Sequence, residues 1–202
     1  MSRIYVFKRF ERFWHWAQAL LIMTLMLTGF ETHGSYSLFG FESAVEIHTI
    51  AAWSLVALWV FAVFWHVTTG EWKQYIPTLD KLQAMTQFYL SGIFTGAPHP
   101  FRQTTLHKHN PLQRLAYLFV LLIVSPIIWT SGWFYLFYDS WQDWGFGWLN
   151  LEYVAMFHVI AAFMMLIFLI AHVYLVTAGH TPTSHIKAMI SGWEEVEDQE
   201  QH

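Results

Sequence analysis

The sequence predicts an all-α integral membrane protein, a four-transmembrane-helix bundle with a short interfacial cytoplasmic helix. The chain of 202 residues is 55% hydrophobic and only 12% charged, whereas a soluble domain carries about 25% charged residues. The apolar residues are gathered in four long segments that are apolar on nearly all faces, unlike the helices of soluble proteins. All ten Lys and Arg residues fall on one side of these segments. We therefore expect a single transmembrane domain over residues 1–202.

Four segments are long and apolar enough to cross a hydrocarbon core about 30 Å thick. We expect these helices at about residues 13–30, 44–67, 112–136 and 153–178. Pro126 should kink the third helix, which neighbouring helices can tolerate in a membrane. Between the second and third helices, residues 78–90 carry apolar side chains at helical spacing, which predicts a short helix on the inner membrane surface.

The positions of Lys and Arg predict the orientation. The segments 31–43 and 137–152 contain neither residue type. By the positive-inside rule these two loops face outward, and both termini are cytoplasmic. The outer loops are rich in aromatic residues, which suits an interfacial aromatic belt and also a docking surface for an external subunit. The acidic stretch from Glu194 to His202 is expected to fray.

Two histidines lie inside the fourth segment. His158 and His172 are fourteen residues apart, which is nearly four full turns, so both imidazoles face one side about 21 Å apart. Polar residues at this depth are expensive and usually face the interior of the bundle for a functional reason. Neutral imidazole is a strong axial ligand for haem iron. Two ligands on one face at two depths therefore predict two stacked haems.

Three further histidines lie at helix ends and complete two layers. His48 is at the outer end of the second helix, so we expect it to pair with His158. His15 and His66 are at inner ends, so His172 would pair with one of them. His48 and His66 are eighteen residues apart, about five whole turns, so geometry alone leaves His66 open as the inner ligand.

Other interpretations of the histidines were weighed against the haem hypothesis. Each helix-end histidine taken alone could bond to backbone or lipid headgroups, but their matching depths favour haem. Zinc sites usually take three or four ligands, and the deep membrane segments contain no Asp or Glu. The absence of cysteine excludes cysteine-ligated iron–sulfur clusters and covalent c-type haem. The net charge of −4 is segregated along the chain and says little about partners; we expect no nucleic-acid partner.

Several stretches of the chain match a known family in order and depth. They are Arg12-Phe-Trp-His15-Trp with Thr28-Gly29-Phe30, the helix-two His48, His109-Asn-Pro-Leu-Gln113-Arg before helix three, and His158 with His172. With them the chain resembles the di-haem cytochrome b subunits of membrane-bound nickel-iron hydrogenase, formate dehydrogenase and thiosulfate reductase. The resemblance covers nearly the whole chain. It implies two haem b groups, with iron held by His48 and His158 in the outer site and by His15 and His172 in the inner site.

The resemblance also implies a site for a quinone, either menaquinone or ubiquinone, near the inner haem. Asn110 and Gln113 are the corresponding positions, and their amide groups can bond to a quinone carbonyl. The alternative for Asn110 is helix capping at the Asn-Pro boundary. His66 would then be a partner of the quinone or of a haem propionate. Arg114 and Lys73 are further candidates for pairing with propionates.

The implied function is that of an electron-transfer subunit of a quinone-linked oxidoreductase complex. It would relay electrons between an external periplasmic iron–sulfur or multihaem subunit and the quinone pool, in a bacterial or archaeal inner membrane. One alternative is a stand-alone di-haem superoxide/quinone oxidoreductase, but the acidic outer loops would repel superoxide. A second alternative is a non-redox membrane anchor, which would need no paired histidines. A higher oligomer is compatible with the sequence.

Overall fold

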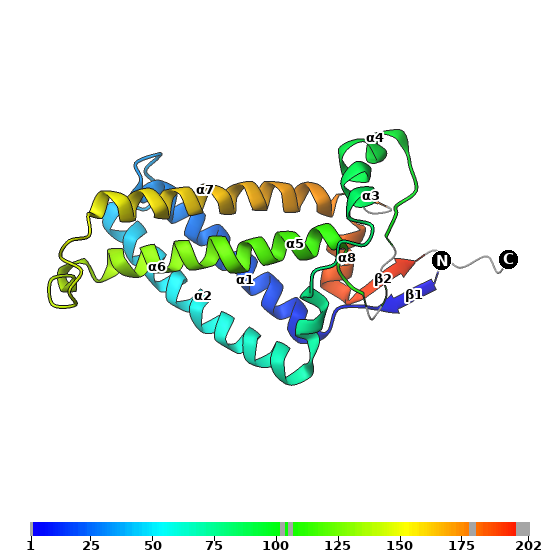
Figure 1. The fold of residues 1–202 in the computed structure, drawn as a ribbon, viewed down its shortest axis with the longest axis horizontal. Helices are drawn as coiled ribbons and strands as arrows, with labels where there is room; N and C mark the ends of the chain where they lie inside the picture. Colours follow the sequence, from blue (N-terminus) through cyan, green and yellow to red (C-terminus); the bar gives the residue numbers. More distant parts are fainter. Residues whose placement is uncertain (1, 102–103, 105–106, 178–180, 197–202) are drawn as a thin grey trace. The chain divides into compact units, whose positions relative to one another are not determined.

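The computed structural model describes residues 2–101, 104, 107–177 and 181–196, and it is mostly helical (Figure 1). Its elements in chain order are β1 (Ser2–Tyr5), α1 (Arg9–Thr32), α2 (Phe41–Thr69), η1 (Glu71–Tyr75), α3 (Leu82–Gln87), η2 (Phe88–Gly92), α4 (Ile93–Thr95), α5 (Pro111–Phe119), η3 (Val120–Val124), α6 (Ser125–Leu136), η4 (Tyr138–Ser140), α7 (Leu151–Val176), α8 (Ser184–Ser191) and β2 (Trp193–Val196). Among the described residues, four helices are long and apolar enough to cross a membrane: α1, α2, the continuous α5–η3–α6 and α7. The predicted all-α membrane fold is thereby confirmed.

The spanning helices agree with the predicted segments but extend further at most ends. α1 begins at Arg9 and α2 at Phe41, a few residues before the expected starts. These extra turns carry polar and interfacial aromatic residues, which a criterion based on apolar length omits although they continue the helix into the interface. α7 begins at Leu151; its predicted end at Ala178 lies outside the described residues.

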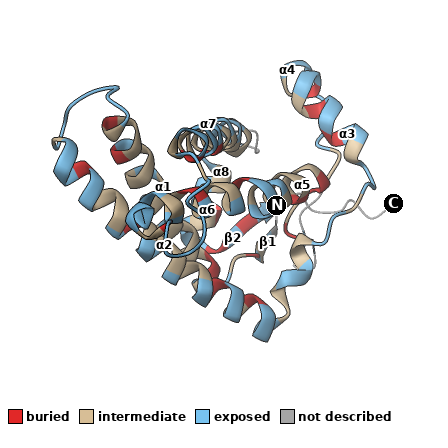
Figure 2. Cartoon of the chain, turned by 60° about the vertical axis from the view of Figure 1, so that its left-hand side comes forward, coloured by how far each residue is buried: buried red, intermediate tan, exposed pale blue. Residues whose placement is uncertain are grey.

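Much of the apolar surface of these helices is uncovered by protein. In the most apolar stretch of 18 residues in each spanning helix, at most 11% of the residues are buried. Leu20, Phe64 and Ile167, from three different helices, are each 66–69% exposed. Figure 2 shows such exposed residues along α1 and α2. Apolar surface this extensive marks contact with an apolar environment, which for these helices is lipid.

The chain forms two compact units. The first unit consists of Met1–Gln74, Arg102–Lys108 and Gly179–His202, and it contains the hairpin of α1 and α2. The loop of this hairpin is held by the carboxylate of Glu31, which is 4% exposed. Glu31 Oε1 accepts three backbone N–H groups, from Leu38, Phe39 and Gly40, at 2.6–2.8 Å. One carboxylate therefore satisfies the donors just before α2 begins and fixes the turn.

The two ends of the chain pair within the first unit. β1 and β2 form an antiparallel ladder in which Tyr5 lies opposite Trp193, with ring centroids 5.3 Å apart. Arg3 and Glu195 add a cross-strand ion pair of 2.8 Å. The prediction that the tail frays from Glu194 onward is therefore wrong for residues 194–196, because β1 provides their backbone partners. Residues 197–202 lie outside the described part of the chain.

α8 docks on the first turns of α1. Arg12 Nη1 donates to the carbonyl of Ile190, and Trp16 Nε1 donates to the carbonyl of Met189 at 3.2 Å. Both carbonyls belong to the last turn of α8, where a cation is favourable and where carbonyls lack helical partners. Two side chains beside His15 thus hold the C-terminal helix.

The second unit consists of Tyr75–Phe101 and His109–Ala178, and in it α7 packs against η3 and α6. The irregularity expected at Pro126 is a π-helical turn, η3, directly before α6. Pro126 has no N–H for the preceding turn, and a wider turn accommodates that loss. The short helix predicted at residues 78–90 is present as α3, η2 and α4 over residues 82–95, with Met85 and Phe88 buried.

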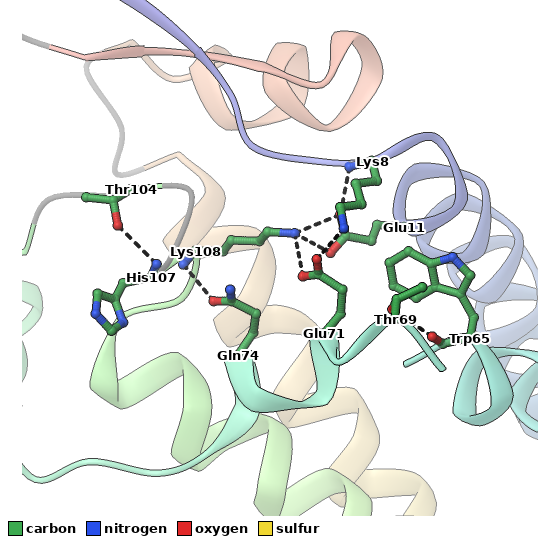
Figure 3. Close-up of polar contacts among 9 residues, drawn as sticks. All are labelled: Lys8, Glu11, Trp65, Thr69, Glu71, Gln74, Thr104, His107 and Lys108. Carbon is green, nitrogen blue, oxygen red and sulfur yellow. Dashed lines mark hydrogen bonds and ion pairs between the residues drawn. The ribbon is translucent and has the colours of Figure 1, made fainter. Parts of the chain in front are cut away.

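A buried cluster of charges joins three separate segments of the first unit (Figure 3). Lys108 Nζ lies 2.7 Å from Glu11 Oε1 and 2.9 Å from Glu71 Oε2, and Lys8 Nζ pairs with Glu71 Oε1 at 2.5 Å. Lys108 is only 3% exposed. Glu11 also accepts the backbone N–H of Lys8 at 2.7 Å, which satisfies a donor at the start of α1. The cluster holds residue 108 against α1 and against the turn after α2.

Replacing Lys108 by Ala should destabilise the protein by about 3–5 kcal/mol, because it leaves carboxylates buried without their central counter-ion. The free energy of unfolding in detergent is the measurement. Lys73→Ala is the matched control, since Lys73 is exposed in η1 beside Glu71. Equal stability of the two variants would contradict a structural role for the cluster.

The same cluster predicts an acid-dependent loss of stability. Burial raises the pKa of Glu71, but the hydrogen bonds from Lys8 and Lys108 outweigh it, so the pKa lies below its ordinary value of 4.5. The stabilisation is then complete above pH 4.5 and is lost as the pH falls through the lower folded-state value. Unfolding measured against pH should show this acid limb. Glu71→Gln should flatten it, and an unchanged limb would exclude Glu71 as its source.

Candidate functional site

His48 is held at the seam between α1 and α2. It is the eighth residue of α2, about 10 Å along the helix axis from the first residue. Its Nδ1 lies 3.0 Å from the hydroxyl of Thr28, a fully buried residue of α1. A Cβ on Gly29 would come within 3.3 Å of His48 Cε1, tighter than nearly all real contacts. Glycine at this position therefore lets the ring lie close against α1.

His158 has the same surroundings in the second unit. It is the eighth residue of α7, so it lies at the same distance from the first residue of its helix. Its Nδ1 is 2.9 Å from the hydroxyl of Ser131, which is 4% exposed on α6. Gly132 follows, and a Cβ there would lie 3.4 Å from His158 Cε1. Each unit thus contains a histidine against a hydroxyl–glycine pair of the preceding helix.

The two inner candidates in the first unit differ in their packing. His66 is 8% exposed, and Trp14 and Trp65 cover its ring, each with centroids 5.0 Å away in edge contact. Its Nδ1 bonds to the carbonyl of Ala62 at 2.7 Å. His15 is half-buried, and its ring meets Trp16 at 5.2 Å.

His172 ends a row of aromatic rings that begins in the loop before α5. Its ring stacks on Phe168 at 5.9 Å, and Phe168 lies 6.5 Å from Tyr117. Tyr117 in turn lies 5.1 Å from His109, next to Asn110. Side-chain contacts therefore connect the predicted quinone loop to the predicted inner ligand within the second unit.

Asn110 and Gln113 form a reciprocal capping box at the start of α5. Asn110 Oδ1 accepts the backbone N–H of Gln113 at 2.9 Å, and Gln113 Oε1 accepts that of Asn110 at 3.0 Å. Pro111 occupies the first turn, where its missing N–H costs nothing. The capping role weighed for Asn110 is thus present. Its Nδ2 donates to the hydroxyl of Tyr89 at 2.9 Å.

The hydroxyl of Tyr89 remains protonated in this position. Burial raises its pKa, and the hydrogen bond from Asn110 lowers it by less, so the pKa is above the ordinary value of 10. The oxygen accepts from Asn110, so the bond to Asn110 does not use the phenolic hydrogen. Tyr89 is a candidate site residue that sequence reasoning missed; its only sequence signal was membership of the short predicted helix.

The Arg114 guanidinium donates hydrogen bonds to two backbone carbonyls. Arg114 is 7% exposed, and it donates through Nε to the carbonyl of His109 at 3.0 Å and through Nη1 to that of Ile76 at 3.1 Å. Through these bonds Arg114 links Ile76 and His109, which lie near the two ends of the connection between α2 and α5. Lys73, the other candidate for propionate pairing, is exposed.

The structure distributes the predicted site residues over both units. His15, His48 and His66 belong to the first unit, and the others, His158, His172, Asn110 and Gln113, belong to the second. Each predicted haem pair takes one histidine from each unit, so the pairing stays a prediction. Within each unit, sequence reasoning missed the hydroxyls of Thr28 and Ser131.

The residues present suit axial ligation of a haem. His48 and His158 are each the eighth residue of their helix, and each has Nδ1 beside a hydroxyl, so Nε2 would be the atom that holds haem iron. Their hydroxyl partners are uncharged and buried, which suits a site within the hydrocarbon core.

Comparison with known proteins gives a consistent result. The family described as prokaryotic cytochrome b561 matches residues 6–192. The cytochrome YdhU of Escherichia coli (strain K12) is 32% identical over 202 residues, covering 95% of this chain and 75% of the relative. A Ni/Fe-hydrogenase B-type cytochrome subunit of Cupriavidus necator is 24% identical over 215 residues, covering 96% of this chain and 88% of the relative. No solved structure matches the chain.

The four apolar spans, the histidines within them and a match over nearly the whole length lead to one conclusion. The chain is a multi-pass bacterial membrane protein that belongs to the prokaryotic cytochrome b561 family.

Proposed function

We propose that this protein relays electrons between an external redox subunit and membrane quinone, using two haem b groups ligated by His48 with His158 and by His15 with His172. The observation that carries the proposal is the matched setting of His48 and His158, two imidazoles at equal helical depth against buried hydroxyls. Bound haem b supplies reversible one-electron chemistry of iron. The chain's own residues supply ligands, depth and exclusion of water.

Equal depth supports one shared outer layer. His48 and His158 each lie seven residues after the first residue of their helix. Helices that start at the same membrane face carry such residues at the same level, about 10 Å along the axis. The inner layer follows from His172, about 21 Å further along α7.

For the inner site, packing favours His15 over His66. An axial ligand needs open volume beside the coordinating nitrogen for a porphyrin. The ring of His66 is buried and edged by two indoles, while His15 is only half-buried. We assign His66 the role of a packed neighbour of the inner site.

The quinone site is proposed at the start of α5, where Asn110 orients Tyr89 and Tyr89 donates to a quinone carbonyl. The hydrogen bonds of the capping box fix Asn110, and its side-chain Nδ2 donates to the Tyr89 oxygen. Gln113 completes the same box and braces the loop. The ring contacts from His109 to His172 support a location next to the inner haem.

The external partner is proposed to be a periplasmic iron–sulfur or multihaem subunit. Three relatives carry the name of a B-type cytochrome subunit of Ni/Fe-hydrogenase, which implies a catalytic partner in their complexes. In this chain Trp148 is 78% exposed and Phe41 69%, each in an outer segment without Lys or Arg. Trp141, expected among these surface aromatics, is instead 3% exposed and donates to the carbonyl of Phe134.

The cytoplasmic placement of both termini is supported by the pairing of β1 with β2. Segments on opposite sides of a bilayer could not form a ladder, so both ends share one side. The basic residues lie on that side as well, which is the cytoplasmic one by the positive-inside rule.

The stand-alone superoxide oxidoreductase and the plain membrane anchor fit less well. Attraction of superoxide requires positive potential, but the outer segments and the first turns of the helices that follow them carry Glu42, Glu46, Asp139, Asp143 and Glu152 and no Lys or Arg. An anchor gains nothing from imidazoles that contact hydroxyls of neighbouring helices.

The number of haems and their ligands can be tested together by the reduced-minus-oxidised visible spectrum and the haem content per chain. The wild-type chain should hold two b-type haems. His48→Ala and His158→Ala should each halve the haem content by removing the same haem, and His15→Ala should remove the other. His66→Ala is the control and should keep both. Loss of one haem in His66→Ala but not in His15→Ala would assign the inner ligand to His66.

The quinone site can be tested through Tyr89. Tyr89→Phe removes the proposed donor and should slow quinone turnover about tenfold at normal haem content, as expected for losing one hydrogen bond. Asn110→Asp keeps a helix cap but cannot donate, so it should have a similar effect. Tyr174→Phe is the matched control, because its hydroxyl reaches only the backbone carbonyl of Tyr89 in the contacts described. Equal turnover in all variants would remove Tyr89 from the site.

A further inference from the structure

The hydroxyls of Thr28 and Ser131 donate hydrogen bonds to carbonyls of their own helices. Thr28 Oγ1 donates to the carbonyl of Thr24 at 2.8 Å, and Ser131 Oγ donates to the carbonyl of Ile127 at 2.6 Å. Their second carbonyl contacts, at 3.3 Å to Leu25 and 3.1 Å to Ile128, are also to acceptors. A hydroxyl has one hydrogen, and a backbone carbonyl can only accept. The hydrogen of each hydroxyl therefore points along its own helix.

These hydrogen bonds to carbonyls determine which imidazole nitrogen carries the proton. The hydroxyl oxygens lie 3.0 Å from His48 Nδ1 and 2.9 Å from His158 Nδ1. With the hydroxyl hydrogens directed to carbonyls, the only attractive arrangement is N–H on Nδ1 donating to the oxygen. Nε2 then carries the lone pair, as an imidazole must to bind iron.

We propose that Thr28 and Ser131 are positioning residues that hold His48 and His158 as the Nδ1–H tautomer, which leaves Nε2 of each ring as the atom that binds haem iron. The inference rests on the proposed haem ligation. It adds that a hydroxyl in each unit tunes the haem that its own histidine binds. Because their oxygens are uncharged acceptors, they fix each ring with only moderate electron donation to the ligand.

Removing one hydroxyl has two expected consequences. The Nδ1–H loses its hydroxyl acceptor, so the ring is held less firmly, and haem affinity should fall roughly ten- to hundredfold. The ligand also becomes a weaker electron donor, so oxidised iron is less stabilised and the midpoint potential of that haem should rise. The potential of the inner haem should not change, because the inner candidates have other partners.

The test uses the full-length, haem-loaded chain in detergent, with redox titration of each haem and the electron paramagnetic resonance signal of the oxidised low-spin irons. Thr28→Val and Ser131→Ala should shift the potential and the signal of the same haem. Thr28→Ser and Ser131→Thr restore a hydroxyl and should restore both readouts. Thr24→Val and Thr130→Val are matched controls, because these residues bond only to their own helix in the contacts described, and both readouts should match wild type.

Unchanged potentials and signals in Thr28→Val and Ser131→Ala would overturn the inference while leaving haem binding intact. Shifts in two different haems would instead overturn the proposed pairing of His48 with His158. A wild-type chain that takes up no haem would instead overturn the proposed function, and this inference with it. Restoration by the conservative variants separates tuning from a general defect in folding.

Discussion

An imidazole inside a membrane must have its N–H satisfied by the protein, because lipid offers no acceptor. This constraint explains the arrangement around His48 and His158. Each ring needs an acceptor from a neighbouring helix, which fixes how far along and in which rotation that helix packs. It also requires a small residue next to the acceptor, since the ring lies against the helix backbone at Gly29 and Gly132. The contact of His48 with Thr28 therefore constrains how α1 packs with α2, and the contact of His158 with Ser131 constrains how α6 packs with α7.

The family assignment and the geometry support different parts of the proposal. Membership of the prokaryotic cytochrome b561 family makes this chain a membrane cytochrome b electron-transfer protein. The internal geometry goes further within each unit, by placing a hydroxyl beside Nδ1 of two histidines and by ordering the loop that contains Asn110. The proposed haem pairing takes one ligand from each unit, and neither the family assignment nor the geometry within a unit decides it. Spectroscopy can decide it.

The sequence was most informative where a property is local or periodic. Apolar length located all four spans, and the spacing of His158 and His172 predicted a shared face. The Asn110–Pro111 boundary could be read as a helix cap from residue types alone. By contrast, the bond between Lys108 and Glu11 spans 97 positions, and no local pattern marks it. The hydroxyls were missed for another reason. Thr and Ser residues in these helices commonly bond to their own backbone, as Thr24 and Thr130 do, so only packing shows which also face a ring.

The pairing of β1 with β2 also bears on how the protein is made. Residues 2–5 leave the ribosome before the four spans, but their partners at residues 193–196 leave after them. The ladder therefore cannot form until all four spans have been synthesised. It needs both ends on one side of the bilayer, so a chain with a missing or inverted span cannot complete it. Closure of this small sheet, with α8 docked against Arg12 and Trp16, is thus a late step of biogenesis that depends on correct insertion.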